Sequence, residues 1–218
     1  MQRKDEGDEA AERPGGLRLR KKLATRQRIS DVATSLFAAR GFDRVTVAEV
    51  AEAAGVSTMT VFNHFPRKED LFLDRIPEGV EVVTSAVHDR AEDESPLAAL
   101  RRVLLDLADR RHPLSAVGDR FPHFWQVVLD SPALRARTRE GLAEAEDALA
   151  AALAHDRGTR PDDPRTRLFA ALVVAAYRCV YTGTAARLMA GESADDVVED
   201  HRRRLNDAFD ALARALEA

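Results

Sequence analysis

VTVAEVAEAAGVSTMTVFNHFPRKEDL, the stretch from Val45 to Leu71, predicts two short helices joined by a tight turn. Thr46 and Glu49 have the spacing of a capping box, in which the hydroxyl accepts a backbone N–H near the helix start and the carboxylate reaches back. Gly55 follows at a plausible helix end, where glycine adopts a positive φ at the least cost. The first helix is therefore expected to lie between Thr46 and Gly55.

The second helix of this pair is bounded by equally clear signals. Ser57 or Thr58 can cap its N-terminus. Pro66 stops it at about His64, because the residue before a proline is pushed out of the helical region. Two helices this close can cover each other's apolar faces and present the second helix to the major groove of DNA. Short helical hairpins occur in many proteins, so the turn alone does not establish DNA binding.

The residues around the turn are more specific than the turn itself. In order along the chain they are Gly41-Phe42, Thr46-Val47, Ala51 to Ser57 and Val61 to Leu71. Together they closely resemble the DNA-binding domain of TetR-family repressors, over residues 23–72. The resemblance implies an all-α protein with an N-terminal three-helix DNA-binding domain that contains the helix-turn-helix. A larger helical domain for ligand binding and dimerisation would follow, over residues 73–218.

The resemblance also implies which residues contact DNA. Thr46 and His64 hold positions that approach backbone phosphates in the family, whereas residues at the turn and in the early third helix face base edges. Met59 departs from the small residue often found at its position and offers only apolar contact. Lys68 is the strongest phosphate candidate, since it should lie at a helix N-terminus, which favours anions. The expected DNA-binding residues are Arg28, Thr46, Ser57, Thr58, Met59, Thr60, Asn63, His64 and Lys68.

The composition is that of a soluble globular protein, with 45% hydrophobic and 32% charged residues among 218. A single cysteine, Cys179, excludes an internal disulfide and a four-cysteine zinc site. We expect no apolar run to reach the length of a membrane span, and the charged N-terminus is not typical of a signal sequence, so we expect a cytoplasmic protein outside the membrane. Net charge is −4, yet residues 17–75 carry eleven basic and seven acidic side chains. Positive charge thus gathers where DNA would bind, although such charges can also simply keep a surface solvated.

Residues 1–22, before this domain, are expected to form a disordered and basic arm. Residues 1–16 lack large apolar side chains and contain Pro14-Gly15-Gly16, which is typical of disorder. The arm can lie along phosphates or enter a minor groove, or it can serve only as a solubilising tail. The first helix of the domain should then run from about residue 23 to residue 40. The basic residues of the arm are Arg18, Arg20, Lys21 and Lys22.

Beyond the DNA-binding domain, the remaining chain is predicted to be wholly helical. One long helix is expected from Lys68 to about Asp89, kinked or split at Pro77. No internal repeat and no convincing strand is visible, so a helical ligand domain is the simplest account. Further helix starts are indicated by capping residues, of which the first three precede a proline: Ser95, Ser131, Asp163 and Ser193.

The last two helices carry more apolar surface than one partner helix can cover. The segment from Leu168 to Tyr181 is apolar nearly all round, interrupted by Arg178, so we expect it to be buried on more than one side. In the TetR family these two helices form a four-helix bundle between subunits. We therefore expect a homodimer through the two C-terminal helices, which suits a palindromic operator. An intramolecular core is the alternative.

Aromatic side chains gather in two segments of the helical domain, where the resemblance implies an effector pocket. Arg178 could bind an acidic group of a ligand, or it could form a structural ion pair with Asp106 or Asp109. His112 and His123 are further polar candidates. We expect an apolar ligand with an acidic head, such as a fatty-acyl compound. The candidate ligand-binding residues are Phe121, Phe124, Trp125, Tyr177, Arg178 and Tyr181, although each aromatic side chain could equally belong to the core.

No pattern in the sequence favours an enzyme. It contains no glycine-rich phosphate loop, no nucleophile elbow and no His-Glu-x-x-His helix. We interpret His201 as part of a solvated helix edge, and we expect no metal site and no cofactor. The sequence therefore predicts a homodimeric DNA-binding regulator, most simply a repressor released from its operator by a small-molecule effector. A helical protein–protein interaction adaptor that retains the helix-turn-helix as a scaffold is the alternative.

Overall fold

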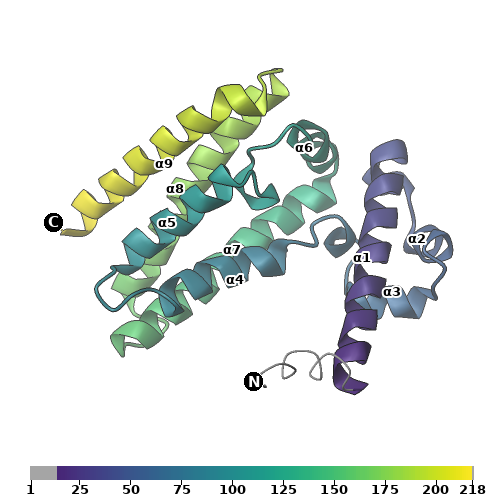
Figure 1. Cartoon of the computed structure of the whole chain (residues 1–218), viewed down its shortest axis with the longest axis horizontal. Helices are drawn as coiled ribbons and strands as arrows, with labels where there is room; N and C mark the ends of the chain where they lie inside the picture. The colour runs from purple at the N-terminus through teal and green to yellow at the C-terminus, as the bar shows by residue number, and fades with distance from the viewer. Residues whose placement is uncertain (1–13, 218) are drawn as a thin grey trace, which may run out of the picture. The chain divides into compact units, whose positions relative to one another are not determined.

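The computed structural model describes residues 14–217, and these residues form helices joined by loops and turns (Figure 1). Within this range no residue lies in a β-strand, so the fold is all-α as predicted. The chain divides into two compact units, the first ending at Asp74 and the second beginning at Arg75.

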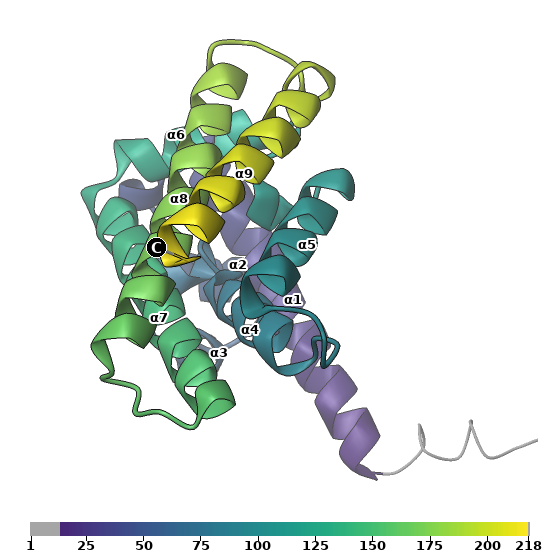
Figure 2. The same ribbon diagram turned by 90° about the vertical axis from the view of Figure 1, so that its left-hand side faces the viewer.

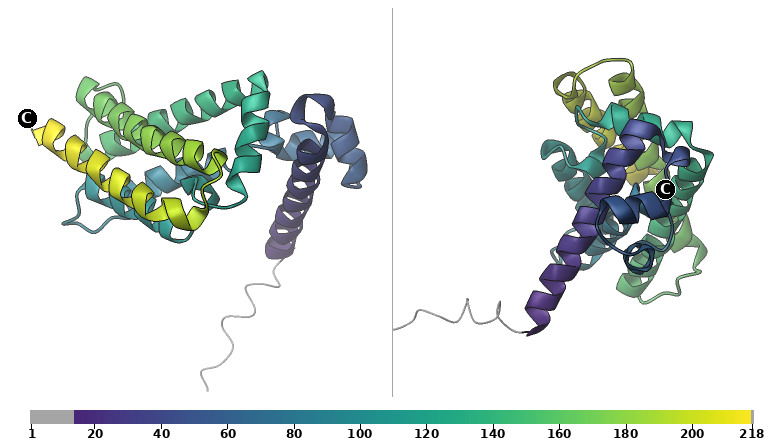
Figure 3. Two further views of the ribbon diagram at one scale, coloured as in Figure 1. Left: turned by 90° about the horizontal axis from the view of Figure 1, so that it is seen from above. Right: turned by 90° about the vertical axis from the view of Figure 1, so that its right-hand side faces the viewer.

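In residues 14–74, the described part of unit 1, there are three α-helices and two short 3-10 helices. The long α1 packs against α2, and α2 packs against α3 (Figure 3). Phe37 of α1 lies at the centre of the core, 4.9 Å from Phe42 and 6.0 Å from Phe72 between ring centroids. The elements are α1 (Pro14–Arg40), η1 (Phe42–Arg44), α2 (Val47–Ala53), α3 (Thr58–His64) and η2 (Glu69–Leu71).

The first helix begins nine residues, or about two and a half turns, earlier than the sequence indicated. Residues 1–13 of the expected arm lie outside the described residues, but α1 already begins at Pro14. Pro14 is tolerated because the first helical turn has no use for its missing N–H. Gly15 and Gly16 weaken a helix by about 1 kcal/mol each, yet they do not stop it, since seven good helix formers follow among residues 17–23.

Unit 2 is a bundle of six α-helices and one 3-10 helix in residues 75–217. In Figures 1 and 2, α8 and α9 run side by side, and α4 lies against α7. Hydroxyl or carboxylate groups of Ser95, Ser131, Asp163 and Ser193 accept backbone N–H groups at helix starts, which confirms those four predictions. The elements are α4 (Ile76–His88), α5 (Pro96–Asp109), η3 (Pro113–Ser115), α6 (Phe121–Asp130), α7 (Pro132–Arg157), α8 (Pro164–Met189) and α9 (Ala194–Glu217).

The long helix expected from Lys68 to Asp89 is wrong in its first third. The chain turns through η2 after Lys68, and α4 begins only at Ile76. Pro77 lies in the first turn of α4, so it marks a helix start and not a kink. Ile76 packs against Gly141 of α7, where an added Cβ would come within 2.9 Å of the Ile76 side chain. The start of α4 is thereby fitted into a notch on α7.

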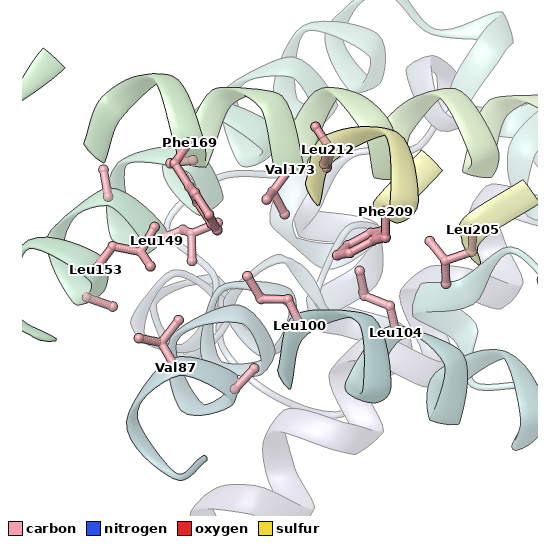
Figure 4. Close-up of a cluster of buried hydrophobic side chains, with 14 of the residues drawn as sticks. Val87, Leu100, Leu104, Leu149, Leu153, Phe169, Val173, Leu205, Phe209 and Leu212 are labelled. Carbon is pink, nitrogen blue, oxygen red and sulfur yellow. The ribbon is translucent and has the colours of Figure 1, made fainter. Parts of the chain in front are cut away.

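The core of unit 2 joins helices α4, α5, α7, α8 and α9 (Figure 4). Leu100, Leu149, Leu205 and Phe209 are all fully or almost fully buried within it. At roughly 1.5–3 kcal/mol for each buried large apolar side chain, this cluster stabilises the bundle far more than any single surface ion pair. Its members are otherwise Ala86, Val87, Leu104, Leu107, Ala150, Ala152, Leu153, Phe169, Ala170, Val173, Val180 and Leu212.

Helix α8 is less buried than the sequence indicated. By length and composition it could cross a membrane, with mean hydropathy 1.4 in its most apolar window, which corrects our expectation that no run is long enough. This is possible because the segment from Leu168 to Ala186 is rich in alanine and contains a single charged residue, Arg178. Only 33% of that window is buried inside the chain, so much of its apolar surface lies uncovered in a single copy. A core helix buried on several sides was expected, and α8 is not one within one subunit.

Candidate DNA-binding surface and ligand-binding domain

The helix-turn-helix of unit 1 is held in place by local capping bonds. Thr46 accepts the backbone N–H of Glu49, whose carboxylate in turn accepts the backbone N–H of Thr46 at 2.7 Å, so the predicted capping box is present. The pKa of Glu49 is lowered to about 2, first by the hydrogen bond from the Thr46 backbone and then by Arg40. Gly55 has φ +65° in the turn, and Ser57 accepts the N–H of Thr60 at the start of α3. These short-range bonds fix the direction in which α3 leaves the turn.

Helix α3 has one buried side and one open side. Val61 is 1% exposed and faces the core of unit 1. Met59 is 68% exposed and Phe62 is 45% exposed, and Thr58 and Asn63 are exposed beside them. Phe62 is therefore not a core residue, because its place on α3 turns the ring to the surface. An exposed apolar pair on a short capped helix is suited to contact with another molecule.

Arg26 of α1 braces the end of α3, a role the sequence did not reveal. Its guanidinium lies 4.2 Å from the centre of the Phe65 ring. It donates to the backbone carbonyls of His64 and Asp74, at 3.3 and 3.0 Å. Ser30 donates to the Asp74 carboxylate at 2.7 Å, so α1 ties both ends of the segment after α3. Arg28, two residues further along, is exposed and available to a ligand.

Lys68 occupies a different environment from the one expected of a phosphate ligand. Its Nζ donates to the backbone carbonyl of Phe42 at 2.7 Å and lies 4.2 Å from the centre of the Phe42 ring. Burial lowers the pKa of this amine, while Asp43, Glu69 and Glu49 oppose the shift. The side chain is thus turned inward because a carbonyl and an aromatic face bind it there. The ammonium of Lys68 therefore already has partners within unit 1, and a phosphate would have to compete with them.

His64 lies at the C-terminal end of α3 in a positive environment. Burial lowers its pKa, and the charges of Lys22 and Arg26 lower it further. A histidine whose pKa is lowered in this way is neutral near pH 7. Its ring can then donate one N–H to an anion, and the nearby positive charges favour the anion's approach.

Five aromatic rings of unit 2 pack directly on one another, as the gathering in the sequence predicted. Phe121 of α6 lies 5.8 Å from Trp125 and 5.4 Å from Tyr181 of α8, between ring centroids. Tyr177 lies 6.1 Å from Tyr181, and Phe124 lies 6.1 Å from Phe121. Ala116, Ala185, Leu188 and Val197 complete this apolar cluster. The rings fill the space between α6 and α8 themselves, so a guest here would have to separate them.

One hydrogen bond leads from this aromatic cluster towards α4. Tyr177 donates its hydroxyl to the Leu114 carbonyl of η3 at 2.6 Å, and burial raises the pKa of that hydroxyl above its usual range. Leu114 Cδ2 packs on Gly79 of α4, 3.8 Å from where a Cβ would stand. His112 Nε2 lies 3.1 Å from Glu78 of α4. The segment around η3 therefore contacts the aromatic cluster on one side and the first turns of α4 on the other.

Arg178 lies apart from the aromatic cluster. Its side chain is exposed on α8, about 100° round the helix from Tyr177 at 3.6 residues per turn. The carboxylates of Asp106 and Asp109, considered as its structural partners, form ion pairs with Arg110 and Arg202 instead. The predicted ion pair is therefore wrong, because nearer arginines bind both acids. The candidate His123 is likewise exposed.

His201 is fully buried, which overturns its interpretation as part of a solvated helix edge. It is 0% exposed, and its Nδ1 lies 2.8 Å from the hydroxyl of Thr184 on α8. Its Nε2 has no hydrogen-bond partner among the described residues. Burial lowers the pKa of His201 to about 4, opposed by Asp200. Glu199 is exposed, but His201 is two positions further round α9 and faces α8.

These features define a class of protein: an all-α, two-unit DNA-binding transcriptional regulator with a helix-turn-helix reader. Residues 29–74 match the family model described as bacterial regulatory proteins, tetR family, and residues 94–217 match the MftR C-terminal domain. The second match covers more than half of the chain. The chain belongs to the TetR family.

Similar proteins of known name support this assignment. The chain is 34% identical over 171 residues to the HTH-type transcriptional regulator TcmR of Streptomyces glaucescens, covering 76% of this chain and 75% of TcmR. It is 36% identical over 87 residues to the regulator TtgR of Pseudomonas putida, covering 38% of this chain and 40% of TtgR.

Solved structures share the fold. Salmonella enterica GusR has a TM-score of 0.52 and 20% identity, covering 90% of this chain and 97% of GusR. A complex of SmeT with triclosan has a TM-score of 0.56 and 20% identity, covering 88% of this chain and 91% of SmeT. SmeT is the repressor of a multidrug efflux pump in Stenotrophomonas maltophilia.

Proposed function

We propose that this chain represses transcription by binding a palindromic operator as a homodimer, and that a small molecule bound in unit 2 releases it. The observation that carries the proposal is the open face of α3, held by capping bonds at both ends of the turn. As a non-enzymatic regulator it would act where the DNA is, in the cytoplasm.

The roles on DNA follow from what each side chain can offer. Thr58, Met59 and Phe62 present methyl, thioether and ring carbons, which suit thymine methyl groups in the major groove. The Ser57 and Thr60 hydroxyls already bond each other at 2.8 Å, so they would contact DNA as a fixed pair. Phosphates would be held by the exposed or half-buried groups at the rim, namely Arg28, Thr46, Asn63 and His64. In this proposal Lys68 supports the loop after α3 and does not touch DNA.

A second copy of the chain would cover the open side of α8. A stripe of mostly small residues runs along that side at intervals of three, four or seven positions, and these residues are exposed or half-buried in one copy of the chain. Small side chains allow two helices to approach closely. Two copies joined in this way would present two readers, as a palindrome requires. The stripe consists of Leu168, Ala175, Cys179, Thr182 and Ala186.

The effector would bind at the aromatic cluster between α6 and α8. Phe121, Trp125 and Tyr181 offer apolar surface, and the complex of SmeT with triclosan shows that a structurally similar protein binds a small molecule. An acidic head was expected because of Arg178, which is exposed, so we retain only the apolar character of the ligand. A ligand that separates the rings would also strain the Tyr177–Leu114 hydrogen bond and the contacts of η3 with α4. By linkage, an effector that weakens DNA binding must itself bind less tightly to the DNA-bound form.

The test is a salt titration of the purified full-length protein on duplex DNA from upstream of its own gene, with the mass of the complex determined. A footprint over a palindrome at the mass of a dimer supports the proposal. Binding to a protein partner with little salt dependence, and no footprint at low salt, would favour the adaptor alternative.

A further inference from the structure

The first three turns of α1, before Arg26, have no role in the helix-turn-helix described so far. The TetR-family model begins at residue 29, whereas α1 begins fifteen residues earlier at Pro14. Between Pro14 and Ser30 the chain contains no acidic residue. It contains six basic residues, which are Arg18, Arg20, Lys21, Lys22, Arg26 and Arg28.

This extension is not stabilised by packing. Its leucines Leu17, Leu19 and Leu23 are 48%, 57% and 56% exposed. Arg18 lies three and four positions before Lys21 and Lys22, a spacing at which like charges repel on a helix. No acidic residue in the first turn balances the positive end of the helix dipole. An anionic partner would relieve both forms of repulsion.

The basic side chains of the extension line a hollow that is shared with α3. Arg18, Lys21 and Lys22 contribute from α1, and Thr60 and His64 contribute from α3. The positive potential here reaches α3, since the charge of Lys22 helps to lower the pKa of His64. The remaining lining residues are Leu19 and Thr25. The hollow therefore joins the extension to the helix that faces the bases.

We infer that this hollow binds the DNA sugar–phosphate backbone beside the major groove occupied by α3, with Arg18, Lys21 and Lys22 as phosphate ligands. The inference rests on the proposed DNA-binding function and extends its surface. From Thr25 back to Pro14 the helix rises about 17 Å, at 1.5 Å per residue. That length corresponds to about five base pairs at 3.4 Å each. The extension thus reaches phosphates outside the bases that α3 contacts, and phosphate contacts position a protein without specifying sequence.

The test compares two triple variants of the full-length protein. Arg18→Gln, Lys21→Gln and Lys22→Gln remove the three ligands, while glutamine keeps the helix propensity of the originals. The matched control changes Arg110, Arg139 and Arg160 to Gln, three exposed arginines of unit 2, and so alters net charge equally. Binding is measured on a mixed-sequence 40-base-pair duplex and on duplex from upstream of the gene, between 50 and 200 mM salt. Circular dichroism checks that helix content is retained.

Loss of three phosphate contacts should lower the slope of log K against log salt by about 2.7. Between 50 and 200 mM salt the wild type should therefore lose roughly forty-fold more affinity than the variant. The ratio of affinities for the two duplexes should stay the same, and the protected region should shorten at both ends. The control variant should keep the wild-type slope.

Three results would overturn the inference. If the wild type binds duplex with a steep salt dependence and the extension variant keeps that slope, the hollow holds no phosphates although the proposed function stands. If the wild type binds neither duplex, the proposed function and the inference both fail. If the variant keeps its duplex binding but loses binding to phosphatidylserine vesicles, the extension is a membrane-surface helix with its leucines in the lipid.

Discussion

The open face of α3 and the aromatic cluster of unit 2 are both candidate binding sites, yet they are built in opposite ways. The face of α3 consists of exposed side chains on a helix fixed by bonds between residues three apart, such as Ser57 with Thr60. The aromatic cluster consists of one buried ring, Phe121, and four half-buried rings from α6 and α8, which pack on each other. A site of the first kind is ready for its partner. A site of the second kind must open, and its opening is what an effector can couple to another part of the protein.

The largest expected effect is a loss of folding stability that is confined to one of the two units. Phe65 is 1% exposed and supports α3 and Arg26, so Phe65→Ala should destabilise unit 1 by about 3–5 kcal/mol. We expect faster hydrogen exchange in α2 and α3 and loss of DNA binding. Trp125 is the only tryptophan and lies in unit 2, so its fluorescence transition in urea should move little.

Phe209→Ala is the matched variant in the core of unit 2, where Phe209 is 0% exposed. It should shift the Trp125 transition by a similar free energy and leave exchange in α2 and α3 nearly unchanged. Equal shifts of both probes in both variants would show that the two units unfold as one, which would remove the basis for comparing them separately.

The next effect concerns acid stability of unit 2. Because the pKa of His201 is about 4 when folded, the unfolded chain binds more protons than the folded chain as pH falls from about 6.5 towards 4. Stability is therefore retained above that window and lost within it. Between pH 7 and pH 4.5 the loss attributable to His201 should be roughly 2–3 kcal/mol. His201→Leu should remove this part of the pH dependence in urea titrations followed by Trp125.

His123→Leu is the control for this measurement, since His123 is an exposed histidine on α6. It should leave the pH dependence of unfolding as in the wild type. A wild type whose stability is flat between pH 7 and pH 4.5 would show that His201 accepts a proton in the folded state, and that its environment is more open than the buried ring suggests.

What the sequence could predict follows the same division. The capping box at Thr46, the positive φ of Gly55 and the four later helix starts depend on residues close together in the chain, and all were predicted. The gathering of aromatic residues in α6 and α8 was also visible, because hydrophobic periodicity survives without knowledge of partners. A sequence pattern predicts such a feature when the interacting residues are close together in the chain.

The predictions that differ from the structure concern residues whose partners lie far away in the chain, or residues for which two sequence signals favour different structures. Lys68 finds the Phe42 carbonyl 26 positions away, and His201 finds Thr184 on a different helix. Asp106 and Asp109 had two choices of arginine, and the nearer ones pair with them. Gly15 and Gly16 indicated a break, but the helix formers that follow outweighed them. For Lys68 and His201 the deciding contact depends on packing that no local pattern contains.

A smaller effect should distinguish a residue that stabilises the helix-turn-helix from a residue that contacts DNA. Lys68→Met keeps the length of the side chain but removes one of two donors to the Phe42 carbonyl, the other being the backbone N–H of Val45, so unit 1 should lose about 1–2 kcal/mol. The salt slope of DNA binding should stay unchanged. Arg28→Met, on an exposed position of α1, should do the reverse, lowering the slope by about 0.9 with little change in stability. A fall in slope for Lys68→Met would restore its phosphate role.

Loss of the contacts that connect the aromatic cluster to α4 should have a smaller effect still. Tyr177→Phe keeps the ring but removes the donor to the Leu114 carbonyl, at a cost of about 1 kcal/mol. We expect faster hydrogen exchange in the first turns of α4, because η3 would no longer be fixed between the cluster and Gly79. Tyr181→Phe is the control, since no hydrogen bond of its hydroxyl is seen in residues 14–217. Equal exchange in both variants would mean that η3 does not connect the cluster to α4.

The smallest effect on stability should accompany a qualitative change in function. Met59 is 68% exposed, so Met59→Ala should change the free energy of unfolding by less than about 0.5 kcal/mol. It removes the thioether that we place against base edges, and a poorly matched base pair costs about 1–3 kcal/mol in a specific site. Selection from randomised duplexes should therefore return a different preferred base at one position of each half-site, with the salt slope unchanged. Thr46→Ala, at a phosphate-facing cap, should weaken binding to all sequences alike. If Met59→Ala ranked the duplexes as the wild type does, the open face of α3 would not be the surface that distinguishes bases, however well its geometry suits the groove.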